Sequence, residues 1–420
     1  MRPCWIRLLS SLVLSAVCTG FTGSAATART APAPLVLTGG TIWPAPDTAP
    51  IEHGALVVSE GRIVAVGSFA AMALPAEATF IDCTGQTIVA GFWNSHVHFT
   101  EPKWSGAATR RAPDLETNLR DMLTAHGFTT AVDLASLLSD TLALRRRIDS
   151  GEIAGPRILT AGTPIYPTNG VPYYVTENLP PEVVATMPAP ATAEEAEAIV
   201  AANHAAGADL LKLFLVTGVR DGARIKLVSM DPSIARRATA AAHRLGQKVV
   251  VHPSSIQGVD IALDAGVDAL AHATQDPENL TAAYIDRLIA ADIAMIPTLA
   301  LFRETRNAAA VRDEVRRFAH AGGRILFGTD VGFLDDYAAM RREFDLLADA
   351  GFTPAEILAA LTTTPAAEFG AAHESGRIAE GYVADVVVLD GTPADGAALF
   401  TRVNRTIRAG RTIYVAPAAP

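Results

Sequence analysis

The chain has 420 residues, half of them apolar and 19% charged, so the composition predicts a folded globular protein and excludes a disordered one. This length is enough for one large domain plus a smaller one. The formal net charge of −10 argues against binding to nucleic acid, because no basic patch offsets the acidic side chains.

Residues 1–28 have the features of a secretory signal peptide. Arg2 and Arg7 form a positive segment, an apolar run follows over 8–17, and the small residues 26–28 suit cleavage. The apolar run is too short to span a membrane, so a membrane anchor is the less favoured interpretation. We expect a periplasmic or secreted protein without a membrane segment after cleavage. It would carry 32 basic and 44 acidic residues and only Cys83, which leaves no intramolecular disulfide.

Short β-branched runs occur near both ends of the chain. Between residues 34 and 90 they are separated by turn signals such as Gly39-Gly40. Similar β-branched runs occur again over 384–389 and 411–415. The simplest interpretation is one composite β-sandwich domain built from residues 29–90 and 371–420. The middle of the chain would then be inserted into this domain.

The inserted segment, residues 91–370, alternates strands and helices. Eight runs are predicted as strands: the first ends at 98, and the others are 130–133, 157–160, 210–215, 248–252, 269–272, 294–297 and 325–330. A helix is predicted over 232–245, with Asp231 as its N-cap. This α/β rhythm is typical of a (β/α)8 TIM barrel. A doubly wound open sheet is less favoured, because no Gly-rich phosphate turn follows the first strand.

His96 and His98 lie at the end of the first predicted strand. Side chains two residues apart on a strand point to the same face, so the two imidazoles form half of a metal site. Short HxH matches also arise by chance. The interpretation therefore depends on ligands at the ends of other strands, where barrels carry their chemistry.

Three further strand ends carry residues that can bind a metal. His252 and His272 each terminate an apolar strand, although a single histidine in such a place is more often structural. Asp330 ends the eighth strand and is interpreted either as a metal ligand or as the cap of a following helix.

Lys212 interrupts the fourth strand, between Leu211 and Leu213, with a group that is costly to bury unpaired. For an ordinary strand the favoured interpretation is a lysine whose aliphatic part is buried and whose ammonium group reaches solvent. Near four histidines and bound cations, however, an uncompensated ammonium group would be repelled.

These residues resemble the metal-dependent amidohydrolase superfamily over nearly the whole mature chain. The resemblance includes the HxH pair, the strand-end histidines and aspartate, and the closing segments 361–366 and 376–386. It is greatest to the imidazolonepropionase-like and Xaa-Pro dipeptidase-like members. One departure is the stretch 90–95, Ala-Gly-Phe-Trp-Asn-Ser, where the family commonly has Pro-Gly-aliphatic-Ile-Asp.

The resemblance implies two divalent metal ions, zinc by preference. His96 and His98 would hold one metal and His252 and His272 the other. Lys212, carboxylated by CO2, would bridge them, and Asp330 would bind the first metal and act as the catalytic base. Such a pair of metals can make a bridging water more acidic and polarise a substrate carbonyl.

The predicted reaction is hydrolysis of the C–N (amide) bond in a small-molecule substrate, a dipeptide or an N-acyl amino acid. A lactone or cyclic-imide hydrolase with the same centre is the alternative, and a non-catalytic binding barrel is a third reading. The candidate substrate contacts lie in predicted loops, with Tyr174 and Arg220 preferred; the others are Tyr173, Arg224 and Lys226. Homo-oligomerisation is left open.

Overall fold

The computed structural model describes residues 33–179, 181–333, 337 and 339–417, so the predicted signal peptide at 1–28 lies outside the described residues. Two sheets contain the strands near the two ends of this range, and the second of them combines early strands with late ones. The first has the order β4-β3-β1-β5 and the second the order β18-β17-β16-β6-β2. The strands are β1 (Leu35–Thr38), β2 (Thr41–Ile42), β3 (Gly54–Ser59), β4 (Arg62–Ser68), β5 (Thr79–Asp82), β6 (Gln86–Ala90), β16 (Val386–Asp390), β17 (Val403–Arg408) and β18 (Arg411–Val415).

Strand β6 joins the early and late parts of the chain, because it pairs antiparallel with β16 from Ala90–Val386 to Gln86–Asp390. The buried apolar residues of the two sheets form one cluster that includes Leu37, Leu56, Ile88, Val386 and Ile407. Two other clusters contain most of the buried apolar residues of the middle of the chain, and the larger of them also includes Val89 of β6 and Val387 of β16.

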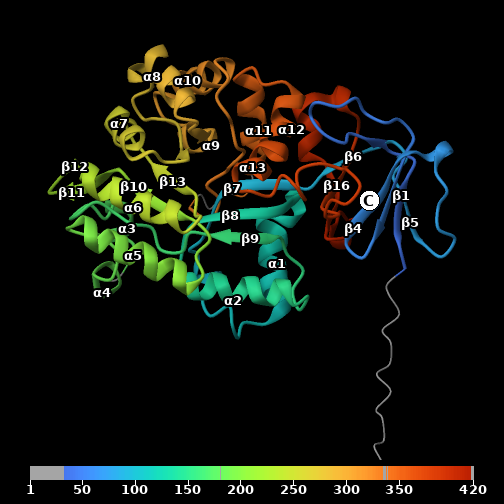
Figure 1. Ribbon diagram of the computed structural model, residues 1–420, viewed down its shortest axis with the longest axis horizontal. Helices are drawn as coiled ribbons and strands as arrows, with labels where there is room; N and C mark the ends of the chain where they lie inside the picture. The colour runs from blue at the N-terminus through green and yellow to red at the C-terminus, as the bar shows by residue number, and fades with distance from the viewer. Residues whose placement is uncertain (1–32, 180, 334–336, 338, 418–420) are drawn as a thin grey trace, which may run out of the picture. The chain divides into compact units, whose positions relative to one another are not determined.

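The middle of the chain contains two parallel sheets, of order β7-β8-β9 and β10-β13-β14-β15 (Figure 1). Their strands are β7 (Phe92–Phe99), β8 (Phe128–Ser136), β9 (Arg157–Thr160), β10 (Leu211–Phe214), β13 (Val249–His252), β14 (Ala269–Ala271) and β15 (Ala294–Ile296). Three isolated parallel bridges extend these sheets: Ile165 with Leu213, Met295 with Ile325, and Val97 with Val331. Seven of the eight predicted strands are therefore confirmed as strands.

One apolar cluster draws residues from every one of these parallel segments. It contains Trp93, Val132, Ala161, Leu210, Val250, Ala269, Ala294 and Leu326, among others. Because side chains alternate along a strand, Lys212 and His252 lie on the same faces as Leu210 and Val250, and so point toward this cluster.

Helices follow most of the parallel strands. The helices of eight or more residues are α1 (Ala112–Met122), α2 (Leu138–Asp149), α5 (Ala193–Ala206), α6 (Pro232–Arg244), α7 (Ile256–Ala265), α8 (Ala282–Ala290), α10 (Ala308–His320), α11 (Ala339–Asp349) and α12 (Pro354–Leu361). Four short ones are α3 (Tyr173–Thr176), α4 (Pro181–Val184), α9 (Leu299–Phe302) and α13 (Thr363–Glu368). In α6 the predicted N-cap is confirmed, since Asp231 accepts a hydrogen bond from Ser233 N. No helix among the described residues is long and apolar enough to cross a membrane.

Two local predictions are wrong. Arg220, Arg224 and Lys226 do not lie in loops but on a two-stranded hairpin formed by β11 (Val216–Asp221) and β12 (Arg224–Ser229). The run 325–330 is not a regular strand, because the backbone N–H groups of Thr329 and Asp330 both donate to His96 O, which a regular parallel ladder does not allow.

Candidate metal centre

Three of the predicted ligands converge on one point. His98 Nε2 lies 2.8 Å and His96 Nε2 3.1 Å from Asp330 Oδ1, and the two Nε2 atoms are 3.2 Å apart. All three residues are buried. A cation with ligands at about 2.0–2.1 Å places neighbouring donor atoms about 3 Å apart, so this spacing fits a metal ion.

Hydrogen bonding fixes the orientation of His98. Its Nδ1 lies 3.2 Å from Ala135 O, and a carbonyl oxygen can only accept, so Nδ1 carries the proton. The lone pair of Nε2 then faces the carboxylate of Asp330 at 2.8 Å. Two acceptors at this distance require a proton or a cation between them. The donor set therefore fits a metal ion.

The other predicted histidines continue the same cluster. Ring centroids are 5.0 Å apart for His96 and His98, 4.7 Å for His96 and His272, and 4.7 Å for His272 and His252. His252 also stacks on Phe214, with centroids 4.8 Å apart. The structure thus brings all four histidines together, and His96 and His98 form with Asp330 a group whose ligand atoms all lie within 4.8 Å of one another.

Lys212 does not reach solvent, so the interpretation of it as an ordinary extended lysine is wrong. Its side chain is buried, and Nζ has no hydrogen-bond partner among the described residues. Nζ lies 5.4 Å from the centre of the Phe214 ring. Burial lowers the pKa of Lys212 to about 7. A fully buried amine with no partner requires an explanation, which carboxylation or a ligand would supply.

Burial also keeps His96, His252 and His272 neutral. It lowers the pKa of His96 to about 4 and that of His252 to about 3, and it holds the pKa of His272 well below its usual value. Burial alone would raise the pKa of Asp330, but His96 and His98 hold it well below its usual range. At neutral pH these three histidines are therefore uncharged imidazoles and Asp330 is a carboxylate, which are the forms that bind metals.

Asn94 connects β7 to the segment that carries Asp330. Its Oδ1 accepts hydrogen bonds from the backbone N–H groups of Thr329 (3.2 Å) and His96 (3.3 Å), and its Nδ2 donates to Thr329 Oγ1 (2.8 Å). Asn94 belongs to the stretch that departs from the family pattern. The departure therefore lies in a residue that holds the predicted ligands in place and removes none of them.

Close packing explains two glycines beside the centre. A Cβ on Gly328 would lie 2.9 Å from His96 Cβ, and a Cβ on Gly332 would lie 1.9 Å from His98 O. These glycines permit the segment around Asp330 to approach β7 closely. Asp330 itself has a left-handed backbone, with φ of 59°.

The two preferred substrate contacts lie in different surroundings. The Tyr174 ring is 5.2 Å from that of Phe333, and burial raises the pKa of its hydroxyl, with the Asp330 charge adding to the effect. Arg220 instead donates to Glu177 at 2.7 and 3.2 Å and lies over the Tyr173 ring. A substrate carboxylate would have to displace Glu177 in order to reach Arg220.

A buried glutamate holds the loop that follows His272. Glu314 on α10 accepts hydrogen bonds from Thr274 N (2.9 Å) and Thr274 Oγ1 (2.7 Å). Burial raises the pKa of Glu314 to about 7.

This raised pKa predicts a pH dependence of stability. Between the ordinary pKa and about 7 the folded state keeps a proton that the unfolded state loses, so stability falls as pH rises through this window. One such proton contributes at most about 1.4 kcal/mol per pH unit. We expect the free energy of unfolding of Glu314→Gln to lack this pH dependence between the ordinary pKa of glutamate and about 7. Urea unfolding of the metal-free protein at several pH values in this range measures the difference. Equal slopes for the variant and the wild type would contradict it.

Several contacts of the site were not predicted from the sequence. The sequence pattern places Asn94, Asp133 and Thr298 in or beside strands and assigns none of them a contact with the predicted ligands. Asp133, fully buried, accepts hydrogen bonds from the Ser136 and Thr160 hydroxyls and so holds the strand that carries Ala135 O. A polar residue inside an apolar strand was the available signal for Asp133.

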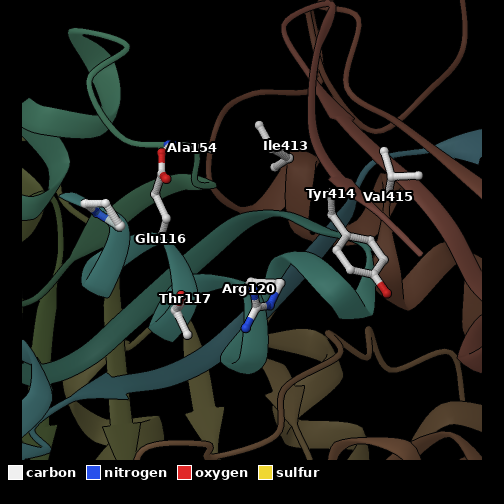
Figure 2. Close-up of a pocket in the computed structure, with 8 residues that line it drawn as sticks. Glu116, Thr117, Arg120, Ala154, Ile413, Tyr414 and Val415 are labelled. Atoms are coloured by element: carbon white, nitrogen blue, oxygen red, sulfur yellow. Dashed lines mark hydrogen bonds between the residues drawn. The ribbon is translucent and has the colours of Figure 1, made fainter. Parts of the chain in front are cut away.

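A surface hollow of about 360 Å³ lies elsewhere, between α1 and β18 (Figure 2). Glu116, Arg120 and Tyr414 are among its lining residues. Glu116 already accepts a hydrogen bond from Ala154 N, and Arg120 pairs with Asp121. None of the six predicted ligands lines the hollow, so it is not part of the centre.

The chain has an α/β fold whose parallel strands present histidines and an aspartate to one buried point. This arrangement defines a class of proteins that can hold a metal at their strand ends. Within that class, the chain belongs to the amidohydrolase family, whose sequence model matches residues 87–413. This finding confirms the resemblance to the amidohydrolase superfamily. No curated protein matches the chain.

Solved structures agree with this family. The chain is 29% identical to a putative prolidase from Bifidobacterium longum, with a TM-score of 0.73 over 92% of this chain and 95% of that one. A Xaa-Pro dipeptidase with bound methionine in its active site is 21% identical, with a TM-score of 0.77 over 91% of this chain and all of that one (100%). Molinate hydrolase is 18% identical, with a TM-score of 0.76 over 93% and 97% of the two chains.

Proposed function

We propose that this member of the amidohydrolase family is a metal-dependent hydrolase of an amide bond in a dipeptide or an N-acyl amino acid. The metal site is supported mainly by one contact: the lone pair of His98 Nε2 lies 2.8 Å from Asp330 Oδ1. Two acceptors this close require a cation or a proton between them. The prolidase and Xaa-Pro dipeptidase among the similar structures favour a dipeptide as the kind of substrate.

We also propose the complete architecture. The three isolated bridges and the apolar cluster drawn from all eight parallel segments favour a closed (β/α)8 barrel over 91–370. The pairing of β6 with β16 and the separate core of the outer sheets favour a composite β-sandwich from 29–90 and 371–420. Export to the periplasm or the medium remains a proposal that rests on residues 1–28.

The proposed centre has two cation positions. His96, His98 and Asp330 would hold one cation and His252 and His272 the other, with carboxylated Lys212 between them. The orphaned Lys212 Nζ fits this assignment, because it is a buried polar atom without a hydrogen-bond partner among the described residues. Divalent metals, zinc by preference, would supply Lewis acidity toward the substrate carbonyl and toward water.

The protein's own groups would orient the substrate and move the proton. Asp330 Oδ1 takes both histidine contacts, which leaves Oδ2 to accept a proton from the attacking water and return it to the leaving amine. The half-buried Tyr174, whose raised pKa keeps its hydroxyl protonated, would donate a hydrogen bond to the substrate. Burial of the cluster limits the access of other water.

A substrate panel tests this proposal. Zinc-loaded protein is assayed with dipeptides, N-acyl amino acids, lactones and cyclic imides, and Asp330→Asn serves as the control for contaminating activity. We expect the highest kcat/KM for a dipeptide or an N-acyl amino acid. Faster turnover of a lactone or cyclic imide than of every amide would favour the alternative hydrolase. Absence of turnover throughout the panel would contradict the proposal.

A further inference from the structure

Strand β15 carries no predicted ligand, yet the residue that follows its end touches the centre. Thr298 Oγ1 lies 2.7 Å from His272 Nδ1 and 2.8 Å from Pro297 O. The pairing of β14 with β15 sets this contact, because Ala271 lies opposite Ile296 and His272 N donates to Ile296 O. The ends of the two strands therefore approach each other in register.

The two contacts of Thr298 decide which nitrogen of His272 carries the proton. The hydroxyl has one proton, and Pro297 O can only accept. Both contacts are hydrogen bonds only if Thr298 donates to Pro297 O and accepts from His272 Nδ1–H. The lone pair of His272 is then on Nε2, which is the atom left for a cation.

The backbone at Thr298 indicates that this contact is maintained at a cost. Its φ of 46° and ψ of 53° lie in the left-handed region, which β-branched residues rarely adopt. Glycine or asparagine would adopt this conformation more easily, but neither provides a hydroxyl. Such strain persists only where the surrounding structure fixes it.

Glu343 on α11 is the group that fixes the turn. Its two carboxylate oxygens accept hydrogen bonds from Leu299 N and Ala300 N, both at 2.8 Å, directly after Thr298. Glu343 is fully buried, at 0% exposure, so the pair of hydrogen bonds is shielded from water. Loss of either acceptor would leave a buried N–H unpaired.

We propose that Thr298 is a positioning residue for His272, that its hydroxyl keeps the proton on Nδ1, and that Glu343 holds the turn that presents this hydroxyl. The inference rests on the proposed metal-binding function. It assigns to strand β15 a role that no ligand on that strand supplies.

Zinc affinity of the full-length protein tests the proposal, measured at neutral pH by competition with a chromophoric chelator. Thr298→Val keeps the β-branched shape and removes the hydroxyl, so affinity should fall ~10–100-fold. Thr298→Ser restores the hydroxyl and should match the wild type. Thr239→Val is the matched control, because it removes a buried hydroxyl without a hydrogen-bond partner on α6 and should leave affinity unchanged.

The outcomes separate this inference from the proposed function. A wild type that binds no zinc would refute both. If the wild type and Thr298→Val bind zinc equally, only the role of Thr298 is refuted. The same holds if Thr298→Ser binds zinc as weakly as Thr298→Val. Should Thr298→Val not fold, the ¹⁵N shifts of His272 in the metal-free wild type decide: protonated Nδ1 supports the inference and protonated Nε2 overturns it. Glu343→Gln should weaken zinc binding, and an unchanged affinity would refute its part.

Discussion

Asp330→Asn should lower kcat by a factor of ~10²–10⁴, the usual contribution of a general acid–base group, while zinc stays bound. Asparagine keeps the shape of the side chain and one oxygen that can face His96 and His98, but it cannot accept a proton from water. The three ligand atoms lie within 3.2 Å of one another, so one retained oxygen is enough to preserve that corner of the site.

Steady-state kinetics on the best substrate of the panel, together with metal analysis of the same sample, measure this effect. Asp231→Asn is a suitable control, because Asp231 caps α6 and asparagine is an equally good N-cap. Undiminished kcat in Asp330→Asn would refute the role of Asp330 as base. Loss of the metal together with kcat would assign Asp330 to metal binding alone.

Lys212→Met should have opposite effects on the metal-free and the metal-loaded protein. In the metal-free protein it removes a buried amine without a hydrogen-bond partner, whose pKa burial lowers to about 7. A lysine whose pKa is lower in the folded state than in the unfolded state destabilises the fold at every pH below its unfolded-state pKa. At neutral pH the Lys212→Met variant should therefore have a free energy of unfolding roughly 2–4 kcal/mol higher than that of the wild type. With zinc and bicarbonate it should lose the bridging ligand, and with it most activity.

Denaturant unfolding of both forms, with and without zinc and bicarbonate, measures these changes. Lys226→Met is the control for stability in the metal-free protein, because Lys226 is exposed on β12 and its replacement should change little. A Lys212→Met protein that is less stable without metal, or that gains as much stability from zinc as the wild type does, would contradict the assignment.

Much of the site could be predicted because each ligand stands at a recognisable place in a local pattern. His252 ends the apolar run of β13, His272 directly follows β14, and the HxH pair lies on β7. Such positions can be recognised from periodicity, since a strand end follows from a few neighbouring residues. The burial of Lys212 was not predictable in this way, because its surroundings come from several strands.

The contacts that hold the ligands could not be predicted from local pattern. Asn94 and Thr329 are 235 residues apart in the chain, and Glu343 lies on a helix well beyond the turn that it fixes. The apolar pattern of residues 325–330 predicts a strand, although the segment is irregular. Its departure arises from close approach to His96, which is a tertiary effect.

The metal content of the purified protein decides whether the centre holds two cations. The wild-type protein is reconstituted with excess zinc and bicarbonate, freed of unbound metal and analysed by elemental methods beside Lys212→Met. We expect two zinc ions per wild-type chain and fewer in the variant. One zinc ion or none per wild-type chain would contradict a binuclear centre built from His96, His98, Lys212, His252, His272 and Asp330.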